Sequence, residues 1–131
     1  MVVVAAVGLV LAAVPVWAHH AFAAEFDQDK PLKVQGTVTR WELTNPHSWI
    51  YIDVKDAEAD GKVVTWMIEG ASPNNLYRLG LTKESLPAGT VIMVEGYKAK
   101  DGSTRAVGRN ITFANGKKFF LGLTEAEGAP K

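Results

Sequence analysis

Hydrophobic and polar residues alternate along most of the chain after residue 31, and this period of two is typical of strands with one buried face. The alternation changes phase at Arg40, which predicts a β-bulge or a sharp bend inside one long strand. Turn residues such as Asp60-Gly61, Asp101-Gly102 and Asn115-Gly116 end the alternating segments. The pattern therefore predicts strands over residues 32–43, 49–55, 63–69, 90–99, 106–113 and 117–121.

One short helix is predicted between the third and fourth strands, over residues 73–79. Ser72 is a typical N-cap, and Pro73 fits the first helical position because proline lacks the N–H that would stay unbonded there. Gly80 then provides a C-terminal stop. Leu76 and Leu79 lie three residues apart, so we expect both to bury one face of the helix.

The order of these elements predicts a mainly β protein, a small five- to six-stranded OB-like barrel with one short helix between strands 3 and 4. A bent first strand would let such a small barrel close, because one strand must then serve two sheets. A small open β-sandwich is the alternative. The residues expected in the core are Val34, Val38, Ile50, Ile52, Val54, Val64, Trp66, Ile68, Leu76, Leu79, Val94 and Ile111.

The first 18 residues differ from the rest, because they are apolar, carry no charge and end with Val16-Trp17-Ala18. This stretch is shorter than the roughly 20 residues that span a bilayer, and small residues at its end favour cleavage of a signal peptide before His19. The alternative is cleavage after Ala21-Phe22-Ala23, before Ala24. We therefore expect a periplasmic or secreted protein with no stable membrane span after cleavage. The expected organisation is a signal peptide (1–18), an N-terminal arm (19–31), the barrel domain (32–123) and a mobile tail (124–131).

Charge and cysteine content exclude several classes of function. The 131 residues include 14 basic and 14 acidic side chains, so no overall positive field favours nucleic acid. The chain has no cysteine, which excludes disulfides, thiol catalysis and thiolate metal sites. No catalytic triad, paired-carboxylate spacing or glycine-rich phosphate loop is evident, so we expect a protein that is not an enzyme.

Several short motifs resemble a family of small exported bacterial proteins that is carried as a domain of unknown function. They are His19-His20-Ala21-Phe22, Trp41 to His47 (WELTNPH), Trp66 with Glu69, Ser72-Pro73-Asn74, Pro87 to Thr90 (PAGT) and Lys100 to Ser103 (KDGS). The resemblance covers residues 18–121. It implies a periplasmic or secreted location and an OB-like barrel, and it implies no established activity.

A candidate ligand site follows from the expected pairing of the second and third strands. If Ile50, Ile52 and Val54 face the same side as Val64, Trp66 and Ile68, then the register brings Glu69 beside the Asn45-Pro46-His47 turn. The candidate binding residues are Asn45, His47, Trp49, Tyr51, Met67 and Glu69. Trp49, Tyr51 and Met67 form an outward-facing row, called the outer row below. The alternatives are a structural His47–Glu69 hydrogen bond and an outer row that is covered by the N-terminal arm or a partner.

The three histidines, His19, His20 and His47, are candidate copper ligands. Cleavage before His19 would leave a free α-amine beside its imidazole, and a second imidazole would complete a set of three nitrogens that suits Cu(II). The alternative is that His19 and His20 are polar residues at a loose chain terminus. The sequence thus favours a non-catalytic module that binds a small ligand or a protein partner, with copper binding as the second hypothesis.

Overall fold

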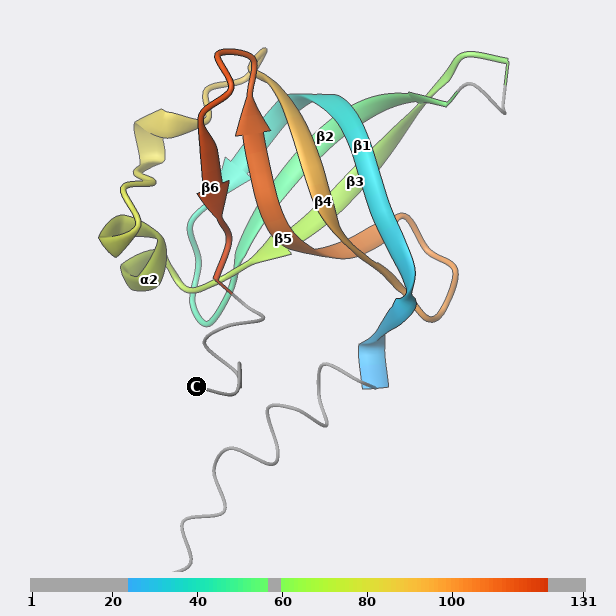
Figure 1. Ribbon diagram of the computed structural model, residues 1–131, viewed down its shortest axis with the longest axis horizontal. Helices are drawn as coiled ribbons and strands as arrows, with labels where there is room; N and C mark the ends of the chain where they lie inside the picture. The colour runs from blue at the N-terminus through green and yellow to red at the C-terminus, as the bar shows by residue number, and fades with distance from the viewer. Residues whose placement is uncertain (1–23, 57–59, 123–131) are drawn as a thin grey trace, which may run out of the picture.

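The computed structural model describes residues 24–56 and 60–122 of the chain, and the signal-peptide, His19, His20 and C-terminal-tail predictions lie outside these residues. Six strands and one short α-helix form the described part (Figure 1). The strands are β1 (Phe26–Glu42), β2 (Ser48–Asp56), β3 (Lys62–Gly70), β4 (Val91–Ala99), β5 (Arg105–Phe113) and β6 (Lys118–Phe120). The helix α2 (Pro73–Arg78) and the 3-10 turn η2 (Lys83–Ser85) lie between β3 and β4.

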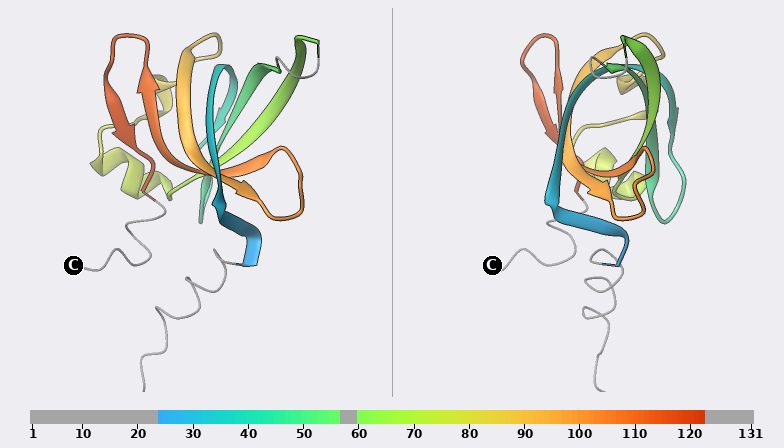
Figure 2. Two further views of the ribbon diagram at one scale, coloured as in Figure 1. Left: turned by 45° about the vertical axis from the view of Figure 1, so that its right-hand side comes forward. Right: turned by 90° about the vertical axis from the view of Figure 1, so that its right-hand side faces the viewer.

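The strands form one sheet in the order β3-β2-β1-β4-β5-β6, and an additional pairing joins β3 to β5. The β3–β5 pairing is parallel and short, with Ile68 opposite Ala106, whereas the other five pairings are antiparallel. It closes a ring of hydrogen bonds through β1, β2, β3, β5 and β4. The right-hand view of Figure 2 shows these strands curving around a common centre.

The long first strand belongs to both sides of the ring. It starts at Phe26, earlier than the expected residue 32, pairs with β4 through Thr37 and pairs with β2 from Thr37 to Glu42. The register with β2 shifts between Val38 and Arg40, so the irregularity that was predicted at Arg40 is confirmed. This shift bends the strand and increases its twist, which allows it to continue from one partner to the other.

The core lies inside the ring, and most of the expected residues are found there. Those confirmed as buried are Val38, Ile50, Ile52, Val54, Ile68, Leu76, Val94 and Ile111. Val34, Val64 and Trp66 are only partly buried. Five further residues that were not among those expected complete the apolar centre: Leu32, Leu81, Leu86, Ile92 and Leu121. Leu32 and Ile92 continue the period of two in β1 and β4, whereas Leu81 and Leu86 lie outside the strands.

The helix is confirmed, but the prediction that Leu79 is buried is wrong. The Ser72 hydroxyl accepts a hydrogen bond from the Asn75 N–H, as an N-cap does. The helix ends at Arg78, and the chain turns at Gly80 with φ of 90°. Leu81 then donates its N–H to the Leu76 carbonyl and occupies the buried position, whereas Leu79 is 43% exposed.

None of the helices within residues 24–56 and 60–122 has both the length and the apolar character needed to cross a bilayer.

Candidate functional site

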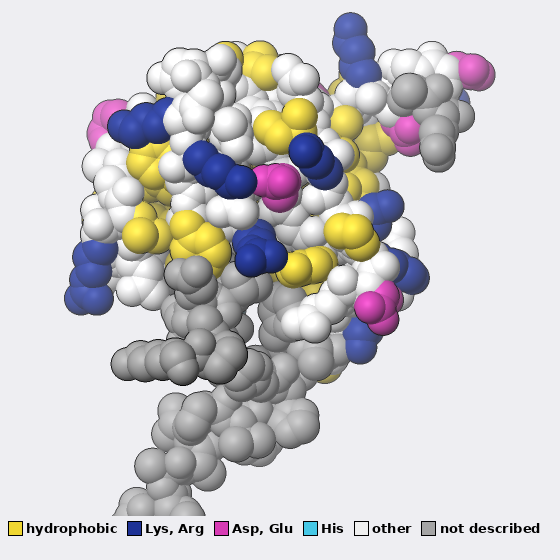
Figure 3. Space-filling model, in the orientation of Figure 1, with side chains coloured by type: hydrophobic (Ala, Val, Ile, Leu, Met, Phe, Trp, Pro, Cys, Tyr) yellow, Lys and Arg dark blue, Asp and Glu magenta, His cyan; other side chains and the backbone are white. Residues whose placement is uncertain are grey.

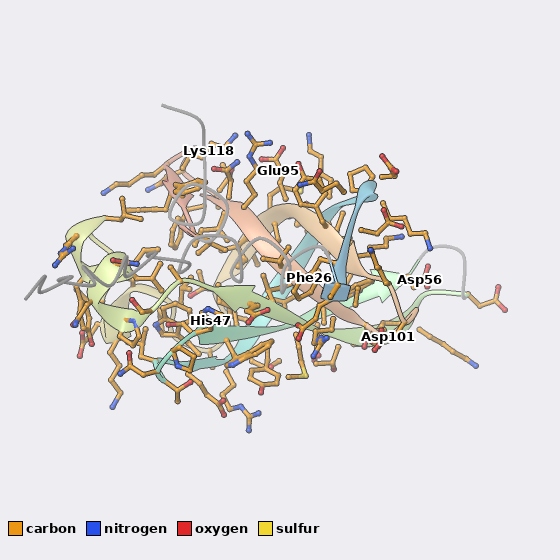
Figure 4. The ribbon with its side chains drawn as sticks, turned by 90° about the horizontal axis from the view of Figure 1, so that it is seen from below. Phe26, His47, Asp56, Glu95, Asp101 and Lys118 are labelled. Atoms are coloured by element: carbon orange, nitrogen blue, oxygen red, sulfur yellow. The ribbon has the colours of Figure 1, made fainter. Side chains whose placement is uncertain are left out.

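The candidate site is built around a hydrogen-bonded pair of side chains, His47 and Glu69. His47 lies in the turn between β1 and β2, and Glu69 lies one residue before the end of β3. His47 Nδ1 is 2.5 Å from Glu69 Oε1, which makes this a direct hydrogen bond. The Thr44 hydroxyl donates to the His47 carbonyl at 2.9 Å and holds the turn in place. Figure 4 shows His47 beside the ribbons of β2 and β3.

The register of β2 and β3 brings Glu69 to this turn. Trp49 pairs with Glu69 and Tyr51 pairs with Met67, as the alternation of hydrophobic residues predicted. The side chains of these four residues alternate with the buried row that contains Ile50 and Ile68, so they belong to the outer face of the two strands. The expected register of the candidate site is therefore confirmed.

Burial of Glu69 changes its acid-base behaviour. The side chain is only 9% exposed, whereas that of His47 is 33% exposed. Removal from water penalises the charged carboxylate and raises its pKa above the ordinary glutamate value, although the nearby His47 acts in the opposite direction. The site thus holds a carboxyl that retains its proton to a higher pH than an exposed glutamate does.

One arginine side chain, Arg40, lies beside the outer row. The Arg40 guanidinium lies 4.0 Å from the centre of the Tyr51 ring, a cation–π contact, and its Nε lies 3.0 Å from Glu42. Trp49, Tyr51 and Met67 are each partly exposed. The rings of Trp49 and Tyr51 offer flat apolar surface to a ligand, and the Arg40 guanidinium beside Tyr51 offers hydrogen-bond donors.

The start of the described chain, which belongs to the expected N-terminal arm, reaches the same face. Strand periodicity did not predict this contact, but the alternative that the arm covers this face anticipated it. Phe26 is buried against Val107 and Ala99, and Arg105 of β5 lies above the Phe26 ring at 5.5 Å. Arg105 also lies 3.5 Å from the Glu25 carboxylate. Glu25 raises the pKa of Glu69 and Arg105 lowers it, so both charges act on the His47–Glu69 pair. The sequence signal that was available was the isolated Phe26 between polar residues.

The chain matches the family of unknown function DUF6152 over residues 6–109. It belongs to that family. The matched part contains every residue of the His47–Glu69 site and of the outer row. No curated protein matches the chain.

In this DUF6152 protein the remaining site predictions have different outcomes. Asn45 is exposed and its side chain makes no hydrogen bond to the described residues, so it lies in the same turn without joining the pair. His19 and His20 lie outside the described residues. Among residues 24–56 and 60–122, no group of three or more His, Asp or Glu side chains is placed to hold a metal ion.

The arrangement of the pair limits its chemistry. The Nδ1 atom of His47 is engaged by Glu69, so Nε2 is the ring nitrogen that remains for a ligand. A carboxylate that bonds one imidazole nitrogen orients the ring and makes the other nitrogen a better acceptor or metal ligand. When Glu69 is ionised, His47 Nδ1–H donates to it, and Nε2 can accept a hydrogen bond from a ligand or bind a metal ion. When Glu69 is protonated and donates to Nδ1, the Nε2–H of His47 is a donor instead.

Proposed function

We propose that this protein is an exported, non-catalytic binding module that holds a small ligand or an extended segment of a partner on the outer face of β2 and β3. The observation that carries the proposal is the His47–Glu69 pair at the end of a row of partly exposed side chains, Trp49, Tyr51 and Met67. The row supplies apolar contact area, and the pair supplies a fixed polar anchor at one end. This combination is typical of binding sites.

The architecture supports an OB-like barrel as the scaffold of this module. Support comes from the ring of hydrogen bonds through five strands, the bulged first strand and the helix between β3 and β4. OB-folds bind extended ligands on the face of their second and third strands, which is the face that carries the outer row here. The neutral net charge favours ligands other than nucleic acid.

Site-specific cross-linking tests the binding module. A photo-reactive phenylalanine analogue replaces Tyr51 in the protein expressed with its N-terminal segment, and a second protein carries the analogue at Lys62, an exposed position at the start of β3. We expect an adduct of defined mass at position 51 that is absent at position 62. His47→Ala should reduce the yield at position 51. Equal labelling at the two positions, or no adduct at position 51, would contradict the proposal.

Copper binding is the second candidate function, and the orientation of His47 favours it. Because Glu69 bonds Nδ1, His47 Nε2 is available as a ligand atom. The α-amine and imidazole of His19, after cleavage of the signal peptide, would supply two further nitrogens, with His20 nearby. The described strand β1 starts at Phe26, which pairs with Ala99 and contacts Val107, so the first described residues lie on the face that holds Glu69.

Copper titration of three proteins tests this candidate: one that begins at His19, one with an additional residue before His19, and His47→Ala. We expect the first to bind Cu(II) most tightly, because only it has both the terminal chelate and the His47 ligand. Its affinity should fall on acidification, since imidazole and amine nitrogens bind metals only when deprotonated. Equal affinities in all three would leave the binding module without a copper site.

A further inference from the structure

A pocket lies on the β1–β4–β5 side of the ring. It has a volume of about 390 Å³, which is within the range of small-ligand sites. Its lining comes from three neighbouring strands: Pro31, Leu32 and Lys33 of β1, Glu95, Gly96 and Tyr97 of β4, and Arg109 and Asn110 of β5. None of these residues belongs to the His47–Glu69 site. In Figure 4, Glu95 and His47 lie on opposite sides of the ring of strands.

A β-bulge gives this pocket two neighbouring polar side chains. Gly96 pairs with Gly108 and Glu95 pairs with Asn110, so Arg109 is an additional residue in β5. In a regular strand, two successive side chains point to opposite faces. Here Arg109 and Asn110 both line the pocket, as expected where a bulge redirects a side chain.

The charges of the pocket leave a local positive excess. Its one carboxylate, Glu95, lies 3.2 Å from Lys118 of β6, and Figure 4 shows the two side by side. Arg109 makes no ion pair with a described residue, and its guanidinium lies 3.5 Å from the Tyr97 hydroxyl. Lys33 lies opposite Glu95 in the β1–β4 register, but within the described part of the chain it makes no ion pair at 4.0 Å or less. Lys33 and Arg109 thus line the pocket beside one carboxylate, which is itself paired with a third cation, Lys118.

The rest of the lining provides apolar surface. Tyr97 presents a partly exposed ring, and Pro31 and Leu32 contribute aliphatic side-chain or backbone surface. The face of the molecule in Figure 3 carries Lys and Arg side chains around acidic groups, with hydrophobic side chains beside them. The surface thus combines positive charge with apolar area, although the whole chain has a net charge of zero.

From this geometry we propose that the Lys33–Tyr97–Arg109 pocket binds a small organic anion, with its carboxylate or phosphate at Arg109 and Lys33 and its apolar body against Tyr97. Arginine is suited to the acidic group because its planar guanidinium can donate two parallel hydrogen bonds to a carboxylate or phosphate. The Tyr97 hydroxyl accepts from Arg109 and helps to keep the guanidinium over the β4 strand.

Titration with three small aromatic probes tests the pocket. Benzoate and phenyl phosphate carry the two acidic groups, and benzyl alcohol is the neutral control. We expect chemical-shift changes at Tyr97 and Asn110 with at least one anion, and at least about tenfold weaker binding of benzyl alcohol, because charge-assisted hydrogen bonds are the stronger ones. Added salt should weaken binding of the anion.

Substitution of the two pocket cations, and of one exposed lysine outside the pocket, tests whether the anion binds at this site. Arg109→Gln and Lys33→Gln should each weaken anion binding, whereas Lys62→Gln on the β2–β3 hairpin is the matched control and should leave it unchanged. Melting curves confirm that each variant folds. Absence of binding by both anions, equal affinity for benzyl alcohol, or unchanged binding by Arg109→Gln would overturn the proposal. The relative affinities of benzoate and phenyl phosphate identify the preferred acidic group.

Discussion

At the scale of single residues, the His47–Glu69 pair joins two different environments. Glu69 is nearly inaccessible to water, whereas one third of the His47 side chain remains exposed. Burial raises the pKa of Glu69, and the contacts with His47 only partly oppose this effect. The folded protein therefore binds the Glu69 proton more tightly than the unfolded chain does, which links this residue to the pH dependence of stability.

The variant Glu69→Gln removes this linkage. The contribution of the Glu69 carboxyl to stability is fully present below the unfolded-state pKa and is lost as pH rises through the higher folded-state pKa. Glutamine does not titrate, so Glu69→Gln does not lose this contribution. We therefore expect the difference in the free energy of unfolding, Glu69→Gln minus native, to increase as pH rises from the unfolded-state pKa of Glu69 through its folded-state pKa.

Urea denaturation across the acidic range measures the difference, with Glu84→Gln as a control that removes an exposed carboxyl. A difference that falls with pH would show that the contacts with His47 outweigh burial.

At the scale of elements, irregular strand pairing shapes both candidate sites. The shift between Val38 and Arg40 lets β1 change partners, and the Arg40 side chain reaches the Tyr51 ring next to it. The shift between Glu95 and Gly96 accompanies the additional residue Arg109 in β5. Bulges thus place the two arginines that we assign to ligand-binding faces.

Gly96 is required for the second of these irregularities. A Cβ atom at this position would lie 1.9 Å from the Val107 carbonyl oxygen, so an alanine must displace the β5 backbone. We expect Gly96→Ala to lower the free energy of unfolding by about 1–3 kcal/mol, as overpacking of a closely packed site does. The control is Gly70→Ala, because the nearest atoms to its Cβ lie 3.9 Å away. Similar losses in the two variants, measured by urea denaturation, would contradict this explanation.

At the scale of the whole molecule, closure of the ring brings distant segments of the chain together. The parallel pairing of β3 with β5 places Glu69 opposite Val107, and Phe26 packs on Val107 from outside. The N-terminal end of the described chain therefore lies on the face that carries the candidate site. The position of signal-peptide cleavage decides which residues precede Phe26 in the mature protein and which residue carries the terminal amine.

We predict that the exported protein begins at His19. The apolar residues 1–18 end in Val16-Trp17-Ala18, which fits the small residues required before a cleavage site. Intact-mass measurement of protein recovered from the periplasm or culture medium tests the prediction. A mass that corresponds to a start at Ala24 would instead indicate cleavage after Ala21-Phe22-Ala23, and it would remove His19 and His20 from the proposed copper site.

The sequence by itself determined the number and order of the strands, the short helix and the register of β2 against β3, but not the early start of β1 at Phe26. These follow from local pattern, because a shift of one residue would move Ile50, Ile52 and Ile68 from the core to the surface. The proximity of His47 and Glu69 could be predicted for the same reason, since the register places Glu69 beside the turn. Local spacing did not predict the exposure of Leu79, because the helix ends at Arg78 and Leu81 returns to the buried position.

Only the tertiary structure decided how the ring closes and which charges meet. The β3–β5 pairing, the contact of Arg105 with Glu25 and the approach of Arg109 to Tyr97 join residues that are far apart in the sequence. Such contacts depend on the curvature and bulges of the whole sheet, whereas the alternation of hydrophobic residues reports only which face of a strand is buried. The same reason explains why the pocket at Arg109 had no signal in the sequence: its position depends on one additional residue in β5.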